Sequence, residues 1–103
     1  MYGMGGNMQQ MMKQAQKLQK QMMDAQEALN KETFEGLSTN DYVKVTLTGD
    51  RKVTALEINE AIVDPDDVEM LNDMVMMAVN DGLSKVEAAH EKTMGRYTKG
   101  LPF

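Results

Sequence analysis

The side chains of this chain that could act chemically are mainly lysines and arginines, and they gather in two places. Lys13, Lys17 and Lys20 are spaced so that they share one face of a helix, and the first acidic residue, Asp24, comes after them. The second group lies near the C-terminus and consists of Lys85, Lys92, Arg96 and Lys99. Such groups neutralise phosphates, so phosphate binding is the chemistry that they predict. The simpler alternative is that both groups are the solvated faces of amphipathic helices.

Residues for catalysis, cofactor binding or metal binding are scarce. The chain has no cysteine and one histidine, His90, and the spacing of Ser38 and Ser84 around it suggests no catalytic triad. The glycines of residues 3–6 match neither a dinucleotide-binding nor a phosphate-binding loop. The acidic stretch of residues 64–67 lacks the glycine and the terminal glutamate of a calcium loop. We therefore expect a protein that is not an enzyme and that uses no cofactor, metal or small-molecule substrate.

The charge of the chain is unevenly distributed. Eleven basic and sixteen acidic residues give a net charge of −5, which on its own argues against an anionic partner. However, no basic residue lies between Val53 and Ser84. The acidic residues of this stretch include Glu60, Asp64, Asp66, Asp67, Glu69, Asp73 and Asp81. The net value therefore hides a separation between an acidic middle and two basic groups.

A heptad pattern predicts a long helix near the N-terminus. Its apolar residues are separated alternately by three and four positions, as in the seam of a coiled coil. They are Met8, Met11, Ala15, Leu18, Met22, Ala25 and Leu29. Asn7 can cap the start, with Gln10 as the reciprocal partner of a capping box. The pattern predicts a helix over residues 8–30, preceded by a flexible tail of residues 1–7.

Between residues 32 and 59 the period of the apolar residues changes to two, which is typical of strands. The apolar members of this alternation are Val43, Val45, Leu47, Leu56 and Ile58. Residues 48–51 supply a turn for a hairpin between two strands. A weaker strand over residues 33–36 is a candidate for a third.

A second long helix is predicted over residues 65–97. Asp64 is suited to cap it and Pro65 to occupy its first position, and Gly95 or Gly100 is expected to stop it. The chain is therefore expected to be a single α+β domain over residues 1–103. It would consist of a long N-terminal helix, a small antiparallel sheet of two or three strands and a long C-terminal helix.

Both predicted helices are too long to lie within a compact protomer. They span about 35 Å and about 50 Å at 1.5 Å per residue, whereas a compact domain of this length is about 26 Å across. A small sheet cannot cover their apolar faces, but a second copy of the chain can, and a two-fold pair uses the same surface twice. The residues predicted at this homodimer interface are Met8, Met11, Ala15, Leu18, Met22, Leu71, Val75 and Ala78.

The order of the elements predicts where the basic groups meet. Because the first helix runs into the sheet and the second runs out of it, antiparallel packing makes their free ends project the same way. Both basic groups then lie at the tips, and the acidic stretch lies near the sheet.

The location of the protein is expected to be the cytoplasm. The longest apolar run, residues 74–79, is far too short to span a membrane, and the N-terminus lacks the features of a secretion signal. The absence of cysteine fits a reducing compartment. A membrane is therefore not an expected partner.

Several segments of the chain resemble the YbaB/EbfC family of nucleoid-associated proteins over essentially the whole length. They are Met11–Gln19 (MMKQAQKLQ), Val43–Gly49 (VKVTLTG), Glu69–Asp73 (EMLND), Val79–Asp81 (VND) and Gly100–Phe103 (GLPF). The resemblance implies a bacterial protein that forms a tweezer-shaped homodimer and binds double-stranded DNA at its arm tips, with an influence on nucleoid organisation and gene expression. Binding is expected to be salt-sensitive with weak or no sequence specificity. The residues predicted to contact DNA are Lys13, Lys17, Lys20, Lys85, Lys92, Arg96 and Lys99.

A second hypothesis belongs to a different class. Twelve methionines and no tryptophan make an unusual apolar composition, and methionine adapts readily to irregular partners. The uncharged, methionine-rich seam could therefore grip apolar segments of other proteins, as a protein-binding adaptor or holdase would.

Overall fold

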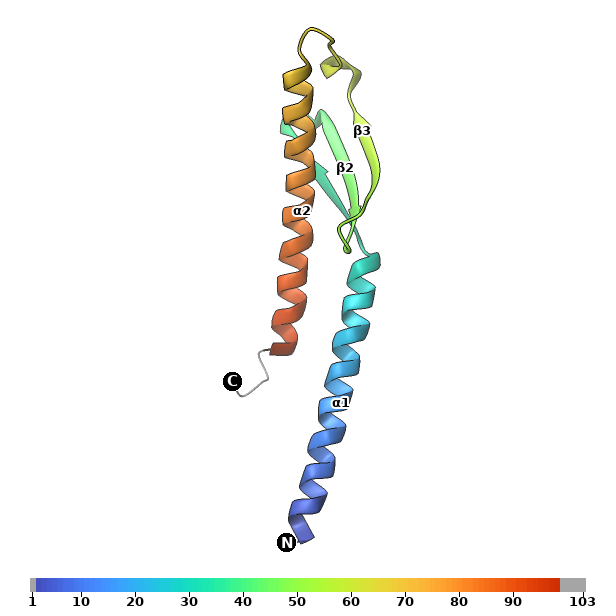
Figure 1. The fold of residues 1–103 in the computed structure, drawn as a ribbon, viewed down its shortest axis with the longest axis vertical. Helices are drawn as coiled ribbons and strands as arrows, with labels where there is room; N and C mark the ends of the chain where they lie inside the picture. Colours follow the sequence, from blue (N-terminus) through green and yellow to red (C-terminus); the bar gives the residue numbers. More distant parts are fainter. Residues whose placement is uncertain (1, 99–103) are drawn as a thin grey trace.

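The structure, a computed structural model, describes residues 2–98 of a molecule with extents of 80 × 22 × 16 Å (Figure 1). Its radius of gyration is 21.4 Å, against about 13 Å for a compact domain of this length. The elements are α1 (Tyr2–Lys31), β1 (Thr33–Leu37), β2 (Val43–Thr48), β3 (Val53–Ile58) and α2 (Val68–Thr98), with 3₁₀ turns at Thr39–Asp41 and Glu60–Ile62. The predicted α+β architecture is confirmed, and the sheet has three strands.

Helix α1 begins at Tyr2, earlier than predicted. From Tyr2 to Lys31 it contains no proline and no β-branched residue, and extending a formed helix is far easier than starting one. Asn7 is therefore inside the helix and does not cap it. The predicted tail of residues 1–7 is wrong over residues 2–7, and Met1 lies outside the described residues.

The three strands form an antiparallel meander in the order β1-β2-β3. Alternate residues of the central strand β2, namely Val43, Val45 and Leu47, are almost completely buried. Helix α2 packs over β1 and β2 on this face, while β3 lies at the edge with nearly all of its residues exposed. We call the sheet together with the first half of α2 the head.

Two glycines allow β1 and α2 to approach each other closely. A Cβ atom on Gly36 would lie 2.0 Å from the carbonyl oxygen of Ala78 and 2.8 Å from the Cα of Gly82. Ala78 is consequently buried, with 0% exposure. The prediction of Ala78 at a homodimer interface is therefore wrong, because its side chain already belongs to the core of its own protomer.

The hairpin between β2 and β3 also joins the two helices. A Cβ on Gly49 would lie 1.8 Å from the carbonyl oxygen of Leu29, so α1 ends against the backbone of the turn. His90 of α2 donates from Nε2 to the carbonyl oxygen of Gly49 at 2.6 Å. The turn predicted at residues 48–51 is confirmed. Its residue with a left-handed backbone is Arg51, with φ of 65°. Gly49 instead allows the hairpin to approach the backbone of Leu29 closely.

Helix α2 begins at Val68, later than predicted. The backbone N–H of Asp67 donates to the carbonyl oxygen of Asp64 at 3.0 Å, which forms a turn ahead of the helix. Asp67 Oδ1 then accepts from the N–H of Met70 at 3.2 Å. The cap is therefore Asp67, and the prediction of Asp64 and Pro65 at the helix start is wrong. The helix continues through Gly95, and Gly100 lies outside the described residues.

Candidate functional site

The N-terminal half of α1 extends beyond the rest of the protomer. Helix α2 ends beside the middle of α1, so the preceding part of α1 projects alone (Figure 1). We call residues 7–20 the arm; within it every residue is exposed except the half-buried Leu18. Lys13, Lys17 and Lys20 are all on this arm, as predicted, and no acidic residue accompanies them. The arm is therefore an isolated helix with a net positive charge.

The end of α2 adds two basic residues to the same side of the molecule. Lys92 and Arg96 are exposed in its last turns, and Lys99 lies outside the described residues. Gln26 Nε2 donates to Met94 Sδ at 3.4 Å, which ties α2 to the C-terminal half of α1. The two free ends thus project in the same direction, but the arm reaches farther than α2 (Figure 1).

Lys85 does not belong to this basic surface. Its Nζ donates to the carbonyl oxygen of Glu35 in β1 at 2.8 Å and pairs with Asp81 at 3.1 Å. Asp81 also accepts from the N–H of Leu37 at 2.9 Å, and this bond, followed by Lys85, holds the pKa of Asp81 below its ordinary value. The prediction that Lys85 lies at the tips is wrong, because its charge is used to fasten α2 to β1.

The head is acidic where the arm is basic. The face of the sheet opposite α2 has a polar hollow lined by Glu35, Leu37, Asp41, Tyr42, Lys44, Glu57, Ile58 and Asn59. Lys44 pairs with Glu35 at 3.1 Å, and Glu35 raises the pKa of Lys44, first through this hydrogen bond and then through its charge. The predicted separation of charge is therefore present in three dimensions.

Over residues 2–98 the structure contains no group of three or more histidine, aspartate or glutamate residues that could hold a metal ion. In the same part of the chain, no helix is long and apolar enough to cross a membrane.

The head also has an apolar strip that α2 leaves uncovered. In the sheet Leu56 pairs with Val45 and Val53 pairs with Leu47, so the strip continues the face on which the core is built. Val53 and Leu56 are nevertheless 52% and 49% exposed. The other large apolar residues exposed in the head are Val68, Met76 and Met77, and Val63 is exposed in the connection between β3 and α2. Sequence reasoning missed this strip because strand alternation identifies the apolar face of β3 but does not show how much of that face α2 covers.

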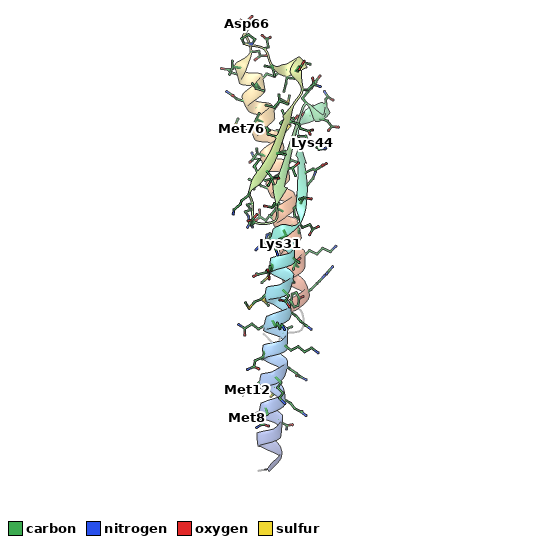
Figure 2. The ribbon with its side chains drawn as sticks, turned by 90° about the vertical axis from the view of Figure 1, so that its right-hand side faces the viewer. Met8, Met12, Lys31, Lys44, Asp66 and Met76 are labelled. Atoms are coloured by element: carbon green, nitrogen blue, oxygen red, sulfur yellow. The ribbon has the colours of Figure 1, made fainter. Side chains whose placement is uncertain are left out.

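The residues predicted at a dimer interface occupy three different settings. Met8, Met11 and Ala15 are exposed on the arm, where Met8 and Met12 lie on one side of α1 (Figure 2). Leu18 and Met22 are half-buried. Leu71 and Val75 pack against the core of their own protomer. The seam of α1 is thus most exposed beyond the end of α2.

The head is a three-stranded meander, and one of the two long helices carries a basic arm. These features define an α+β class in which a small sheet lies between two long helices. The chain belongs to the YbaB/EbfC DNA-binding family, whose sequence profile matches residues 4–101. This is a family of nucleoid-associated proteins, and the resemblance seen in the sequence is confirmed.

Individual relatives agree with this assignment. The chain is 59% identical over 102 residues to a nucleoid-associated protein of Enterococcus faecalis, an alignment that covers 99% of this chain and 97% of the relative. It is 52% identical over 98 residues to a nucleoid-associated protein of Ligilactobacillus salivarius, covering 95% and 94%. The crystal structure of an uncharacterized protein from Helicobacter pylori has the same fold, with a TM-score of 0.63 and 22% identity over 76% of this chain and 90% of that one.

Proposed function

We propose that this protein binds double-stranded DNA as a homodimer, with weak or no sequence specificity, in the bacterial nucleoid. The observation that carries the proposal is the arm, on which Lys13, Lys17 and Lys20 are exposed and which contains no acidic residue. Lys92 and Arg96 add positive charge at the end of α2. Membership of a DNA-binding family and the names of the relatives support the same function.

The composition of the arm favours phosphates over bases as contacts. Residues 7–20 contain no arginine for bidentate contacts with guanine and no aromatic ring for stacking on bases. Lysine contacts with phosphates position a protein on a duplex without reading its sequence. The acidic head repels DNA, so the duplex is held at the arms and away from the sheet.

The direct test is the binding of the purified protein to a labelled duplex, measured by fluorescence anisotropy across a salt series. The three lysines of each engaged arm predict that log K falls with log salt with a slope of about −2.7 per arm, at about 0.9 per phosphate contact. Duplexes of unrelated sequence should bind with similar affinity. Failure to bind even at low salt would mean that the lysines are only a solvated face.

The homodimer proposal rests on the apolar strip of β3. A second copy that covers Val53 and Leu56 would remove two half-exposed apolar residues of each protomer from water. Such pairing leaves the arms outside the interface and available for DNA.

Substitution of Leu56 by glutamate is expected to separate the homodimer into folded monomers, because burying an unpaired carboxylate is strongly unfavourable. Light scattering after size exclusion should give one chain mass of 11.5 kDa in place of twice that value. Ala55→Glu is the matched control, since Ala55 is also exposed on β3 but pairs with Thr46 on the opposite face. If Leu56→Glu stayed dimeric, the interface would have to lie elsewhere.

The second candidate is a protein-binding adaptor or holdase, and the exposure of Met8, Met11 and Met12 favours it. The two candidates give different results in paired measurements. A holdase would suppress the aggregation of an unfolding client protein at equal concentration and would show no salt-dependent affinity for a duplex. A DNA-binding protein should give the reverse pattern.

A further inference from the structure

The arm carries an apolar hollow beyond the reach of α2. It is lined by Met8, Met11, Met12 and Ala15, and the three methionines are 63%, 68% and 60% exposed. Figure 2 places Met8 and Met12 far along α1 from the sheet, and Figure 1 shows that this part of α1 projects alone. Several large apolar side chains gathered together on a surface usually mark a contact with a partner.

The spacing of these residues is that of a socket for a side chain of another helix. They occupy positions i, i+3, i+4 and i+7, the set of four that surrounds one knob in a coiled coil. In the heptad pattern Met8 and Ala15 are at position a, Met11 at d and Met12 at e, and a socket of this kind receives a d residue. Met11 of a second, parallel α1 is such a residue. The surface is therefore complementary to itself, as a two-fold pair requires.

The charges of the arm are arranged so that two copies can meet. At about 100° per residue, Lys13, Lys17 and Lys20 point about 120–180° away from Met8, on the other face of the helix. The seam is flanked by uncharged glutamines such as Gln14 and Gln21. Two seams can therefore come together without like charges between them, and the lysines of both copies then face outward on opposite sides.

We propose that the arms of two copies of this chain pair through this socket, and that the paired arms hold a DNA duplex against each outer face. The inference rests on the proposed function for the lysine contacts, and it adds that the protein brings two duplex segments together. A membrane is a poorer partner for the same methionines, because helices that lie on anionic bilayers need lysines close enough to the apolar face to reach the headgroups.

The area of the seam indicates that this pairing is weak on its own. From Met8 to Met22 the seam is about 21 Å long and, at a width of about 10 Å, covers roughly 200 Å² of each helix. Stable complexes bury at least about 1,200 Å² in total. Pairing should therefore depend on copies being held close together, by the head interface or by a shared duplex.

The functional test uses a variant in which Met8, Met11 and Met12 are all glutamine, a neutral residue of similar helix propensity. A bead-bound duplex is incubated with the protein and a second, labelled duplex, and the captured label is measured. The wild-type protein should capture the second duplex, and the triple variant should capture roughly ten-fold less because the avidity of pairing is lost. Its affinity for a single short duplex should stay within about two-fold, since the lysines are untouched.

The matched control is Met23→Gln, because Met23 is on the same helix, is 62% exposed and lies outside the hollow. It should capture the second duplex as the wild type does. If the triple variant captured as much as the wild type, or if the wild type bound one duplex but captured none, the pairing proposal would be overturned while DNA binding stood. If the wild type bound no duplex at all, the proposed function itself would fail.

A second measurement detects the pairing without depending on capture. The chain has no cysteine, so Met11→Cys introduces a single thiol at the d position of the socket. Under mild oxidation with a duplex present, two such thiols in facing d positions should form an intermolecular disulfide and a covalent dimer. Met23→Cys should remain largely monomeric on a denaturing gel. Equal cross-linking of the two variants would rule out a specific seam.

Discussion

Replacing Lys13, Lys17 and Lys20 together with glutamine should flatten the salt dependence of duplex binding by about 2.7 units of slope for each engaged arm, at about 0.9 per lost phosphate contact. The loss should be similar for duplexes of any sequence, because these side chains contact phosphates and not bases. Fluorescence anisotropy over the same salt range as for the wild type measures both effects. Helix content should be unchanged, since all three positions are exposed on α1 and glutamine is nearly as good a helix former as lysine.

The control for this variant removes the same number of charges from the far end of α1 and the neighbouring hairpin. Lys31, Arg51 and Lys52 are exposed near the junction between α1 and the hairpin, and their replacement by glutamine changes the net charge by the same amount. This control should alter the slope only slightly. If both triple variants changed the slope equally, long-range charge and not the arm would determine binding. An unchanged slope in the arm variant would remove α1 from the DNA contact.

Substitution of Gly36 by alanine is expected to lower the free energy of unfolding by about 3 kcal/mol, at the upper end of the cost of overpacking a core. The added Cβ would meet the carbonyl oxygen of Ala78 at 2.0 Å and the backbone of Gly82 at 2.5 Å. These are backbone atoms of a helix, so β1 and α2 must move apart. For a domain of this size the midpoint of thermal unfolding should fall by more than about 10 °C, which calorimetry or circular dichroism can measure.

Two further glycines provide the comparison for Gly36→Ala. An alanine at Gly82 would meet first the Cδ1 atom of Leu47, at 2.1 Å, and the end of a leucine side chain can rotate away. Its cost should therefore be nearer 1 kcal/mol. At Gly95 an added Cβ has nothing within 4 Å, and alanine there should stabilise the helix by up to about 1 kcal/mol. Equal stability of the Gly36 and Gly95 variants would contradict the close approach of β1 and α2.

The elements of this fold could be predicted from the sequence because each has a distinct apolar period. The three-and-four spacing in α1 and the alternation in β2 and β3 are local properties, and they gave the correct order and type of element. The starts of both helices were less accurate. Asp64 and Asp67 are both good caps, and the turn closed by the Asp67 N–H decides between them, which the residue types alone do not reveal.

The errors in the candidate site have a different origin. Lys85 and Lys92 are both lysines in the second half of α2, and residue type does not distinguish them. Lys85 contacts Asp81 and the backbone of β1, whereas Lys92 is exposed in the last turns of the helix. Ala78 fits the apolar face of α2, but that face meets a strand that contains Gly36, so nothing of Ala78 remains exposed. In both cases the role depends on how α2 lies against the sheet, a long-range arrangement that periodicity does not encode.

Helix α1 is packed against the hairpin at Gly49 near one end, while its other end projects from the protomer. The helix is packed at its C-terminal end, where Leu29 meets the hairpin backbone and His90 holds that backbone from the other side. Met8 lies about 31 Å from Leu29 along the helix axis. A rotation of α1 by about 10° at its junction with Gly49 would therefore move Met8 by about 5 Å. A change in the packing at Gly49 would therefore be amplified at the end of the arm, where the lysines meet the duplex.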